Sequence, residues 1–187
     1  MFGGNLRTQV DRGLTPIGRS LVKTGITPDV ITVIGIVMSG VAAVTIGAGY
    51  LRVGFLFLLL TAIPDALDGA VARAAGTGSK RGAYFDSVSD RLTDGMLFGG
   101  VAWYLASTEP GRIMMLPVAI MGLAMFISYQ RAKAESLGWD AKGGIMERAE
   151  RIVVLAFALL FPELLIATLW VMLVLTAITA VQRFVKV

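Results

Sequence analysis

The chain has 187 residues, of which 56% are hydrophobic, and its mean hydropathy is +0.74. This apolar fraction exceeds the roughly 45–50% of globular domains, and several apolar runs approach the roughly 20 residues that cross a bilayer. Cysteine and histidine are absent, which excludes disulfides, thiolate nucleophiles and imidazole bases, and leaves oxygen ligands for any metal ion. The net charge of +4 is dispersed between apolar runs, so anionic lipid or a phosphorylated substrate is a better partner than nucleic acid.

In chain order, the hydropathy pattern predicts an all-α integral membrane protein with six transmembrane helices in a single domain, 1–187. Residues 1–26 alternate apolar and basic positions at helical spacing, which predicts an amphipathic helix lying at the membrane interface; a solvated basic tail is the alternative. The predicted spans cover about 28–50, 53–75, 82–106, 111–136, 144–161 and 163–184. Small residues recur every four positions in the first span and permit close helix packing. They are Gly35, Ser39, Ala43 and Gly47.

The distribution of Lys and Arg predicts which side of the membrane each connection faces. Basic residues gather in the N-terminal segment, in the second-to-third and fourth-to-fifth connections, and at the C-terminus, whereas the other connections contain only Arg52 and Arg112. The positive-inside rule then predicts a multi-pass protein of the cell membrane with both termini in the cytoplasm. The aspartates at the second-to-third connection are predicted to face the cytoplasm as well.

Five aspartates between apolar segments are the strongest functional signal, because a carboxylate at membrane depth is costly unless it is paired or binds a metal ion. They are Asp65 and Asp68 in the second predicted span and Asp86, Asp90 and Asp94 in the third. Each set lies on one helical face, and the short connection makes the two helices antiparallel neighbours. Converging carboxylates favour divalent cations, two Mg²⁺ ions or Mn²⁺, in an arrangement suited to phosphoryl displacement. The alternative is a set of interhelical ion pairs with Arg73, Arg81 and Arg91.

The pattern Asp65-x-x-Asp68-Gly69-x-x-Ala72-Arg73, followed by Gly82-x-x-x-Asp86-x-x-x-Asp90, resembles the signature of the CDP-alcohol phosphotransferase family. The resemblance implies a CDP-linked lipid donor, an alcohol acceptor, release of CMP, and a homodimer. It assigns the two Mg²⁺ ions to Asp65, Asp68, Asp86 and Asp90, and proton abstraction from the acceptor hydroxyl to Asp90. It assigns donor and nucleotide contacts to Gly69, Ala72, Arg73, Gly82, Asp29 and Thr32.

Three residues near this signature have simpler interpretations. Asp29 and Thr32 lie at the start of the first span, where helix capping is the alternative to a nucleotide contact. Asp94 lies outside the signature, and we expect it to pair with a basic residue.

Basic residues at the predicted cytoplasmic ends of the last three spans indicate a pocket for a phosphorylated acceptor, because long cations at membrane depth are costly unless they meet an anion. They are Arg131, Lys133, Arg148, Arg151 and Arg183. Neutralisation by Glu135, Glu147 and Glu150, or snorkelling to anionic lipid, is the alternative.

The stretches S-Y-Q-R-A-K-A-E-S and E-R-A-E-R are similar to actinobacterial phosphatidylinositol phosphate synthases, a subfamily that takes inositol 1-phosphate. This second resemblance implies that Arg131, Lys133, Arg151 and Arg183 grip the acceptor phosphate. A phosphatidylglycerophosphate synthase that takes glycerol 3-phosphate is the alternative within the family. A cation transporter is the alternative of another class, and the apolar outer halves of spans two and three argue against it because they offer no polar exit path.

Overall fold

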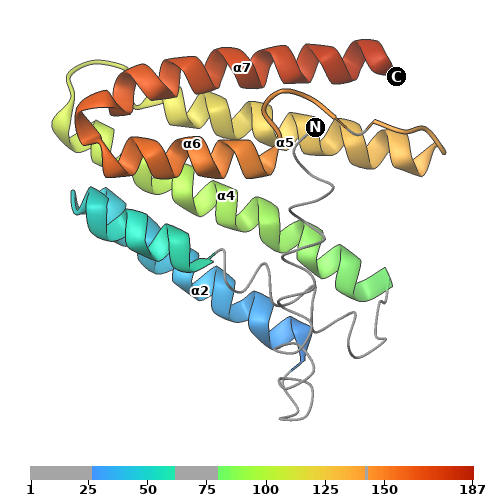
Figure 1. Cartoon of the computed structure of the whole chain (residues 1–187), viewed down its shortest axis with the longest axis horizontal. Helices are drawn as coiled ribbons and strands as arrows, with labels where there is room; N and C mark the ends of the chain where they lie inside the picture. The colour runs from blue at the N-terminus through green and yellow to red at the C-terminus, as the bar shows by residue number, and fades with distance from the viewer. Residues whose placement is uncertain (1–26, 62–79, 142) are drawn as a thin grey trace. The chain divides into compact units, whose positions relative to one another are not determined.

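The computed structural model describes residues 27–61, 80–141 and 143–187, and its regular structure there is entirely helical (Figure 1). The elements are α2 (Pro28–Gly47), an apolar helix over Leu51–Thr61, α4 (Lys80–Thr108), α5 (Met115–Ser136), α6 (Arg148–Leu160), the 3₁₀ helix η1 (Pro162–Leu164) and α7 (Leu165–Lys186). The predicted all-α fold is therefore confirmed. Two predicted features lie outside the described residues. They are the interfacial helix over 1–26 and the polar half of the second span, with Asp65, Asp68, Gly69, Ala72 and Arg73.

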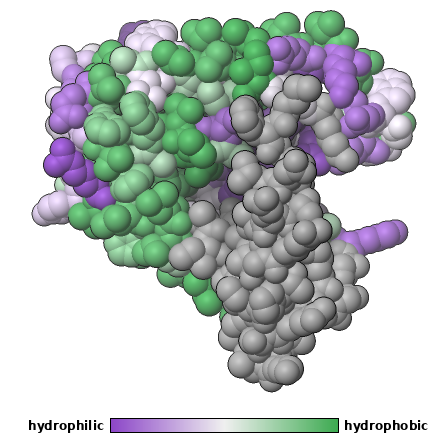
Figure 2. Space-filling model, viewed as in Figure 1, coloured by the Kyte–Doolittle hydropathy of each residue, from purple (hydrophilic) through white to green (hydrophobic). Residues whose placement is uncertain are grey.

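Three helices in the described residues are long and apolar enough to cross a bilayer. They are Pro28–Gly47, Met115–Ser136 and Pro162–Lys186, with 20, 22 and 25 residues. Large hydrophobic side chains stay exposed on their outer faces, for example Val37, Phe126 and Val174. Figure 2 shows mainly hydrophobic side chains along the edge where α7 lies, with hydrophilic ones near its C-terminal end. Such a surface is stable in hydrocarbon, as expected of an integral membrane protein.

Helix α4 is one continuous helix of 29 residues, about 43 Å long at 1.5 Å per residue. It runs without a break through Asp86, Asp90 and Asp94, as the sequence predicted, and then enters an apolar stretch in which Leu97 and Phe98 are buried. A helix satisfies its own backbone hydrogen bonds, so α4 carries these carboxylates without exposing main-chain polar groups to lipid.

The chain divides into two compact units. The first contains residues 1–40 and 57–93, and the second contains residues 41–56 and 94–187. In the first unit, Asp29 at the start of α2 forms an ion pair with Arg81 at the start of α4, with 3.8 Å between Oδ2 and Nη2. Helices α2 and α4 both contribute residues to each unit, so the chain passes from one unit to the other within continuous helices.

Small residues permit close helix packing in the second unit. A Cβ added to Gly100 on α4 would lie 2.5 Å from the Ala43 carbonyl oxygen on α2. One turn later on α2, a Cβ added to Gly47 would lie 2.0 Å from Cε3 of Trp103. Since neither position has room for a larger side chain, the predicted small-residue stripe does pack against another helix at Ala43 and Gly47.

Helices α5 and α7 lie side by side, and α6 packs against α7 (Figure 1). Fully buried apolar side chains from these helices include Ile120, Leu155, Leu159, Leu169 and Met172. Toward the C-terminal ends of both helices, Gln130 Nε2 on α5 donates a hydrogen bond to the Ala180 carbonyl on α7, at 3.2 Å. This packing fixes the ends of α5 and α7 that carry the predicted acceptor residues.

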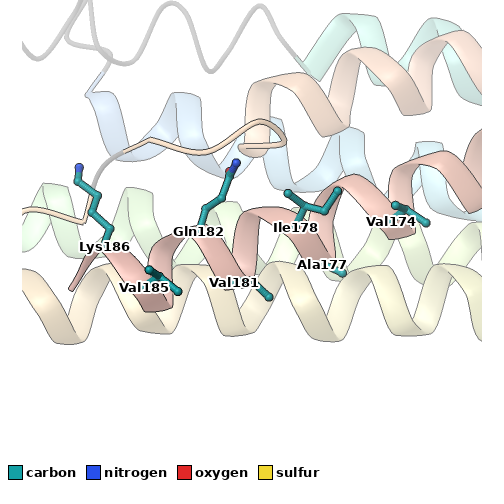
Figure 3. Close-up of a pocket in the computed structure, with 7 residues that line it drawn as sticks. All are labelled: Val174, Ala177, Ile178, Val181, Gln182, Val185 and Lys186. Atoms are coloured by element: carbon teal, nitrogen blue, oxygen red, sulfur yellow. The ribbon is translucent and has the colours of Figure 1, made fainter.

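A groove on the surface of α7 has too few polar side chains for a substrate-binding site. Among the described residues it is lined by Val174, Ala177, Ile178, Val181, Gln182, Val185 and Lys186 (Figure 3). All of these belong to one helix, most are apolar, and none is a predicted site residue. A surface of this kind suits contact with lipid acyl chains, so the groove does not mark the active site.

Candidate active site

Helix α4 carries two of the four predicted metal-binding carboxylates, one helical turn apart. Asp86 is exposed, and Asp90 is partly exposed with Oδ2 lying 3.7 Å from Arg91 Nη1. Arg91 Nη1 also donates to the Ser87 carbonyl at 2.6 Å, so this guanidinium lies along α4 beside Asp90. Gly82 precedes Asp86 by one turn and places no side chain there.

The oxygen donors of α4 fit Mg²⁺ or Mn²⁺, which prefer carboxylate ligands. No group of three or more potential metal-ligating side chains gathers within residues 27–61, 80–141 and 143–187. The other two predicted ligands, Asp65 and Asp68, lie outside those ranges. The four-carboxylate metal site therefore stays a prediction.

The start of α2 holds the two further predicted nucleotide contacts. Thr27 caps this helix, because its Oγ1 accepts a hydrogen bond from the backbone N–H three residues later, at 3.4 Å. Thr32 Oγ1 donates to the Pro28 carbonyl at 3.1 Å. Asp29 instead reaches Arg81 with its carboxylate. The cap is thus supplied by Thr27, and the nucleotide contacts of Asp29 and Thr32 stay predictions.

Asp94 forms a buried ion pair with two arginines of the second unit. It is 4% exposed, and its Oδ1 accepts a hydrogen bond from Arg148 Nε at 3.3 Å while its Oδ2 accepts one from Arg151 Nη2 at 3.0 Å. The prediction that Asp94 pairs with a basic residue is confirmed. Arg148 and Arg151 are three positions apart at the start of α6, so both reach this carboxylate from one helical face.

Arg151 is more deeply buried than Asp94, with 2% of its surface exposed. Besides its bond to Asp94, it donates through Nη1 to the Met146 carbonyl at 3.3 Å. Its Nε is buried and has no hydrogen-bond partner among the described residues. An unpartnered buried donor is costly, which marks Arg151 as a residue whose role requires an explanation beyond packing.

Arg183, on α7, is 4% exposed and binds two other segments of the second unit, α5 and the α5–α6 connection. Its Nε donates to the Gly143 carbonyl at 3.0 Å, its Nη1 to the Ile127 carbonyl at 3.1 Å, and its Nη2 to Glu147 Oε1 at 2.5 Å. The same Glu147 oxygen accepts the Gly143 backbone N–H at 3.1 Å. Arg183 therefore fastens the connection between α5 and α6 to α7.

The α5–α6 connection depends on glycine. Gly143 and Gly144 have φ angles of 101° and 146°, which residues with a Cβ rarely adopt. A Cβ added to Gly144 would also lie 2.4 Å from Thr179 Cγ2. Thr179 Oγ1 accepts the Met146 backbone N–H at 2.9 Å, which holds the end of this connection against α7. Arg148, Arg151 and Arg183, together with Asp94 and Glu147, make up the arginine cluster of the second unit.

The other two predicted acceptor residues lie at the exposed end of α5. Arg131 Nε lies 2.9 Å from Glu135 Oε1, and both side chains are substantially exposed. Lys133 is exposed and makes no ion pair within the part of the chain that the structure describes. Neutralisation by glutamate is thus confirmed for Arg131 and, through Glu147, for Arg183. Phosphate binding by any of the five basic residues stays a prediction.

Sequence reasoning did not identify Thr179, Met146 or Gly143 as parts of this arrangement. Their contacts join positions that are 33 to 40 residues apart, which no local pattern reveals. The adjacent glycines at Gly143 and Gly144 were the available signal, because a pair of glycines between two helices often marks a turn with positive φ.

The family model for CDP-alcohol phosphatidyltransferase matches residues 25–182. The chain is 36% identical over 178 residues to a phosphatidylinositol phosphate synthase of Mycobacteroides abscessus, covering 90% of this chain and 80% of the relative. It is 36% identical over 191 residues to that of Mycobacterium marinum, covering 97% and 82%.

Solved structures give the same picture. The structure resembles the Mycobacterium tuberculosis phosphatidylinositol phosphate synthase with CDP-DAG bound, with a TM-score of 0.88 and 33% identity over 94% of this chain and 93% of that one. The same relative in complex with manganese and citrate matches with a TM-score of 0.86 and 34% identity, over 92% and 88% of the two chains.

Proposed function

The chain belongs to the CDP-alcohol phosphatidyltransferase family, and we propose that it transfers the phosphatidyl group of CDP-diacylglycerol to inositol 1-phosphate, giving phosphatidylinositol phosphate and CMP. The relatives that carry this activity in their names share about a third of its residues over most of both chains. The donor is the lipid bound in the solved relative.

The observation that carries the acceptor assignment is the arginine cluster. Within it, three guanidinium groups share two carboxylates, and Arg151 and Arg183 are almost completely buried. Cations held at such depth are costly, and a phosphate group on the acceptor would offset the cost with charge-assisted hydrogen bonds. Free inositol and serine carry no such group. Arg131 and Lys133, at the exposed end of α5, would complete the phosphate contacts.

The reaction requires one proton transfer. The acceptor hydroxyl oxygen attacks the phosphorus that bears diacylglycerol, the bond from that phosphorus to the CMP oxygen breaks, and CMP leaves with the electron pair. Asp90 accepts the hydroxyl proton. Its carboxylate is partly exposed and lies on a helix, which is compatible with a general base.

Asp65, Asp68, Asp86 and Asp90 would hold two divalent ions, Mg²⁺ or Mn²⁺. When bound, such ions offset the charge of the diphosphate oxygens. The carboxylate oxygens at one-turn spacing on α4 fit these ions, and a solved relative contains manganese.

The remaining donor contacts rest on the sequence signature. Gly69, Ala72, Arg73, Gly82, Asp29 and Thr32 would contact the cytidine nucleotide and its diphosphate. Arg73 offers a bidentate guanidinium to phosphate, while the glycines and alanine let the ligand approach the backbone.

We place the site and both termini at the cytoplasmic face, in a single domain that forms a homodimer. The positive-inside distribution of Lys and Arg supports the orientation. A reporter fused to the C-terminus tests it, since a reporter that is active only outside the cytoplasm would contradict it.

The activity is tested with the full chain purified in detergent or reconstituted in vesicles. CMP release from CDP-diacylglycerol is measured with Mg²⁺ or Mn²⁺ and with inositol 1-phosphate, glycerol 3-phosphate, inositol or serine as the acceptor. We expect turnover with inositol 1-phosphate that disappears when the metal is chelated. Equal turnover with free inositol would contradict the phosphate pocket, and a preference for glycerol 3-phosphate would change the acceptor while keeping the reaction.

A further inference from the structure

We propose that Asp94 is a positioning residue for the acceptor: it holds Arg148 and Arg151 in the orientation that binds the acceptor phosphate, and it does not bind a metal ion. The inference rests on the proposed function. By spacing alone Asp94 extends the row of Asp86 and Asp90 on α4. The simplest interpretation would make it a third metal ligand on this helix. The structure places it differently, because both of its oxygens accept hydrogen bonds from guanidinium groups.

The geometry at Asp94 orients two planar groups at once. Each carboxylate oxygen binds a different arginine, at Arg148 Nε and at Arg151 Nη2. Arg151 has a second fixed contact, from Nη1 to the Met146 carbonyl, and its Nε has no partner among the described residues. A guanidinium carries its N–H donors in one rigid plane, so fixing two corners also fixes the direction of the third.

The position of these arginines is unfavourable for stability alone. Arg148 and Arg151 lie in the first turns of α6, where the helix macrodipole disfavours positive charge. A buried ion pair is rarely more stable than packed apolar side chains, because the desolvation cost is large. Two arginines at a helix start, held by one buried carboxylate, are therefore expected where a site needs cations at fixed positions.

The second carboxylate of the arginine cluster differs from Asp94. The Glu147 side chain is 39% exposed, and its partner Arg183 is held independently by the carbonyls of Gly143 and Ile127. Arg183 would therefore keep its orientation without Glu147. Asp94 is almost completely buried, so water has little access to take its place beside Arg148 and Arg151.

The test is the steady-state kinetics of Asp94→Asn in the full chain, which removes the charge and keeps the size of the side chain. We expect the KM for inositol 1-phosphate to rise on the order of 10- to 100-fold, the loss typical of misplaced binding groups. The KM for CDP-diacylglycerol and the Mg²⁺ concentration for half-maximal activity should stay within about twofold, because only acceptor binding is disturbed. Asp94→Glu, which keeps the charge, should recover part of the loss.

Glu163→Gln is the matched control. It removes an exposed carboxylate whose partner Arg52 is 4.0 Å away, and both side chains are more than 70% exposed. We expect no change in any of the three constants, since a solvated pair of this kind orients no site residue.

The sign of the effect separates positioning from simple neutralisation. If Asp94 only offset positive charge, its removal would make the arginines more attractive to phosphate and would lower the acceptor KM. An unchanged or lowered acceptor KM in Asp94→Asn would overturn the inference. A large rise in the Mg²⁺ requirement would overturn it too, because Asp94 would then be a metal ligand.

Acceptor binding by Asp94→Glu and CMP release by the wild type keep the test decisive when Asp94→Asn does not fold or the proposed function fails. If Asp94→Asn does not fold, direct binding of inositol 1-phosphate in the absence of donor is compared between the wild type and Asp94→Glu, and equal affinity would overturn the inference. Failure of the proposed function has a different appearance, because the wild type itself would then release no CMP with inositol 1-phosphate. A wild type that prefers glycerol 3-phosphate allows the same comparison with that acceptor.

Discussion

The charged side chains in the first turns of α4 are accessible, whereas most of those in the arginine cluster are buried. Asp86 and Asp90 lie open or partly open on the helix surface, whereas Arg151 and Arg183 are buried against main-chain carbonyls. An accessible carboxylate can exchange a metal ion or a proton with its surroundings, but a buried guanidinium can only present N–H groups in a fixed direction. In the proposed function this difference would separate two tasks: the α4 carboxylates would supply the chemistry, and the arginine cluster would select the acceptor.

The largest expected effect follows from Asp90→Asn, which removes the proposed base from the accessible carboxylates of α4. Turnover should fall on the order of 1,000-fold or more, because general base catalysis and a metal ligand are lost together. The midpoint of thermal unfolding should stay near that of the wild type, since Asp90 is only partly buried. CMP release and a thermal melt of the same preparation measure both. Near-normal turnover in a folded variant would remove Asp90 from the base role.

Arg183→Gln tests the buried arginine cluster. It should lower the stability of the protein as well as its turnover. The substitution removes three hydrogen bonds and leaves Glu147 without its arginine, which should lower the free energy of unfolding by about 3 kcal/mol. Arg131→Gln, which breaks an exposed pair with Glu135, should cost less than about 1 kcal/mol. Denaturation curves of the two variants give the comparison. Equal stabilities would mean that Arg183 does not fasten the α5–α6 connection.

Two adjacent glycines on α4 show whether a loss of stability alone can imitate an acceptor defect. Gly100→Ala should destabilise the protein by about 1–3 kcal/mol, because the new Cβ would meet the Ala43 backbone. Gly99 has no neighbour within 4 Å of the corresponding position, so Gly99→Ala should be neutral or stabilising by up to about 1 kcal/mol. Neither variant should change the acceptor KM. A raised acceptor KM in Gly100→Ala would show that instability reproduces the signature expected of Asp94→Asn.

The smallest effect is expected for Arg52→Gln, which breaks an exposed ion pair outside both the α4 carboxylates and the arginine cluster. Arg52 and Glu163 are 4.0 Å apart and highly exposed, so the substitution should change the free energy of unfolding by less than about 0.5 kcal/mol. Thermal melts at low and high salt are the measurement. A loss above about 1 kcal/mol would show that surface ion pairs contribute more here than their exposure indicates.

The sequence predicted those features that depend on local periodicity. Apolar run lengths predicted an all-α membrane protein, and the four-residue spacing of Asp86, Asp90 and Asp94 predicted a helix that continues through the carboxylates. The three-residue spacing of Arg148 and Arg151 predicted a shared face, and both contact Asp94. These features follow from the helical repeat of the chain itself.

The features that the sequence could not predict depend on distant pairings. Arg183 was predicted as a phosphate contact, yet its bonds to Gly143, Ile127 and Glu147 join positions 36 to 56 residues apart. No local pattern specifies which carbonyl a buried guanidinium will meet. The metal-binding roles of Asp65 and Asp68 stay predictions, because both residues lie outside the described ranges.

The central claim is that the arginine cluster selects a phosphorylated acceptor, and a direct competition tests it best. The wild-type chain is supplied with CDP-diacylglycerol, Mg²⁺ and equal concentrations of inositol 1-phosphate and free inositol, and the lipid product is identified by mass spectrometry. We predict phosphatidylinositol phosphate with little or no phosphatidylinositol, since only the phosphorylated acceptor carries the phosphate group that the proposed arginine pocket would bind. Phosphatidylinositol in equal or greater amount would contradict the claim.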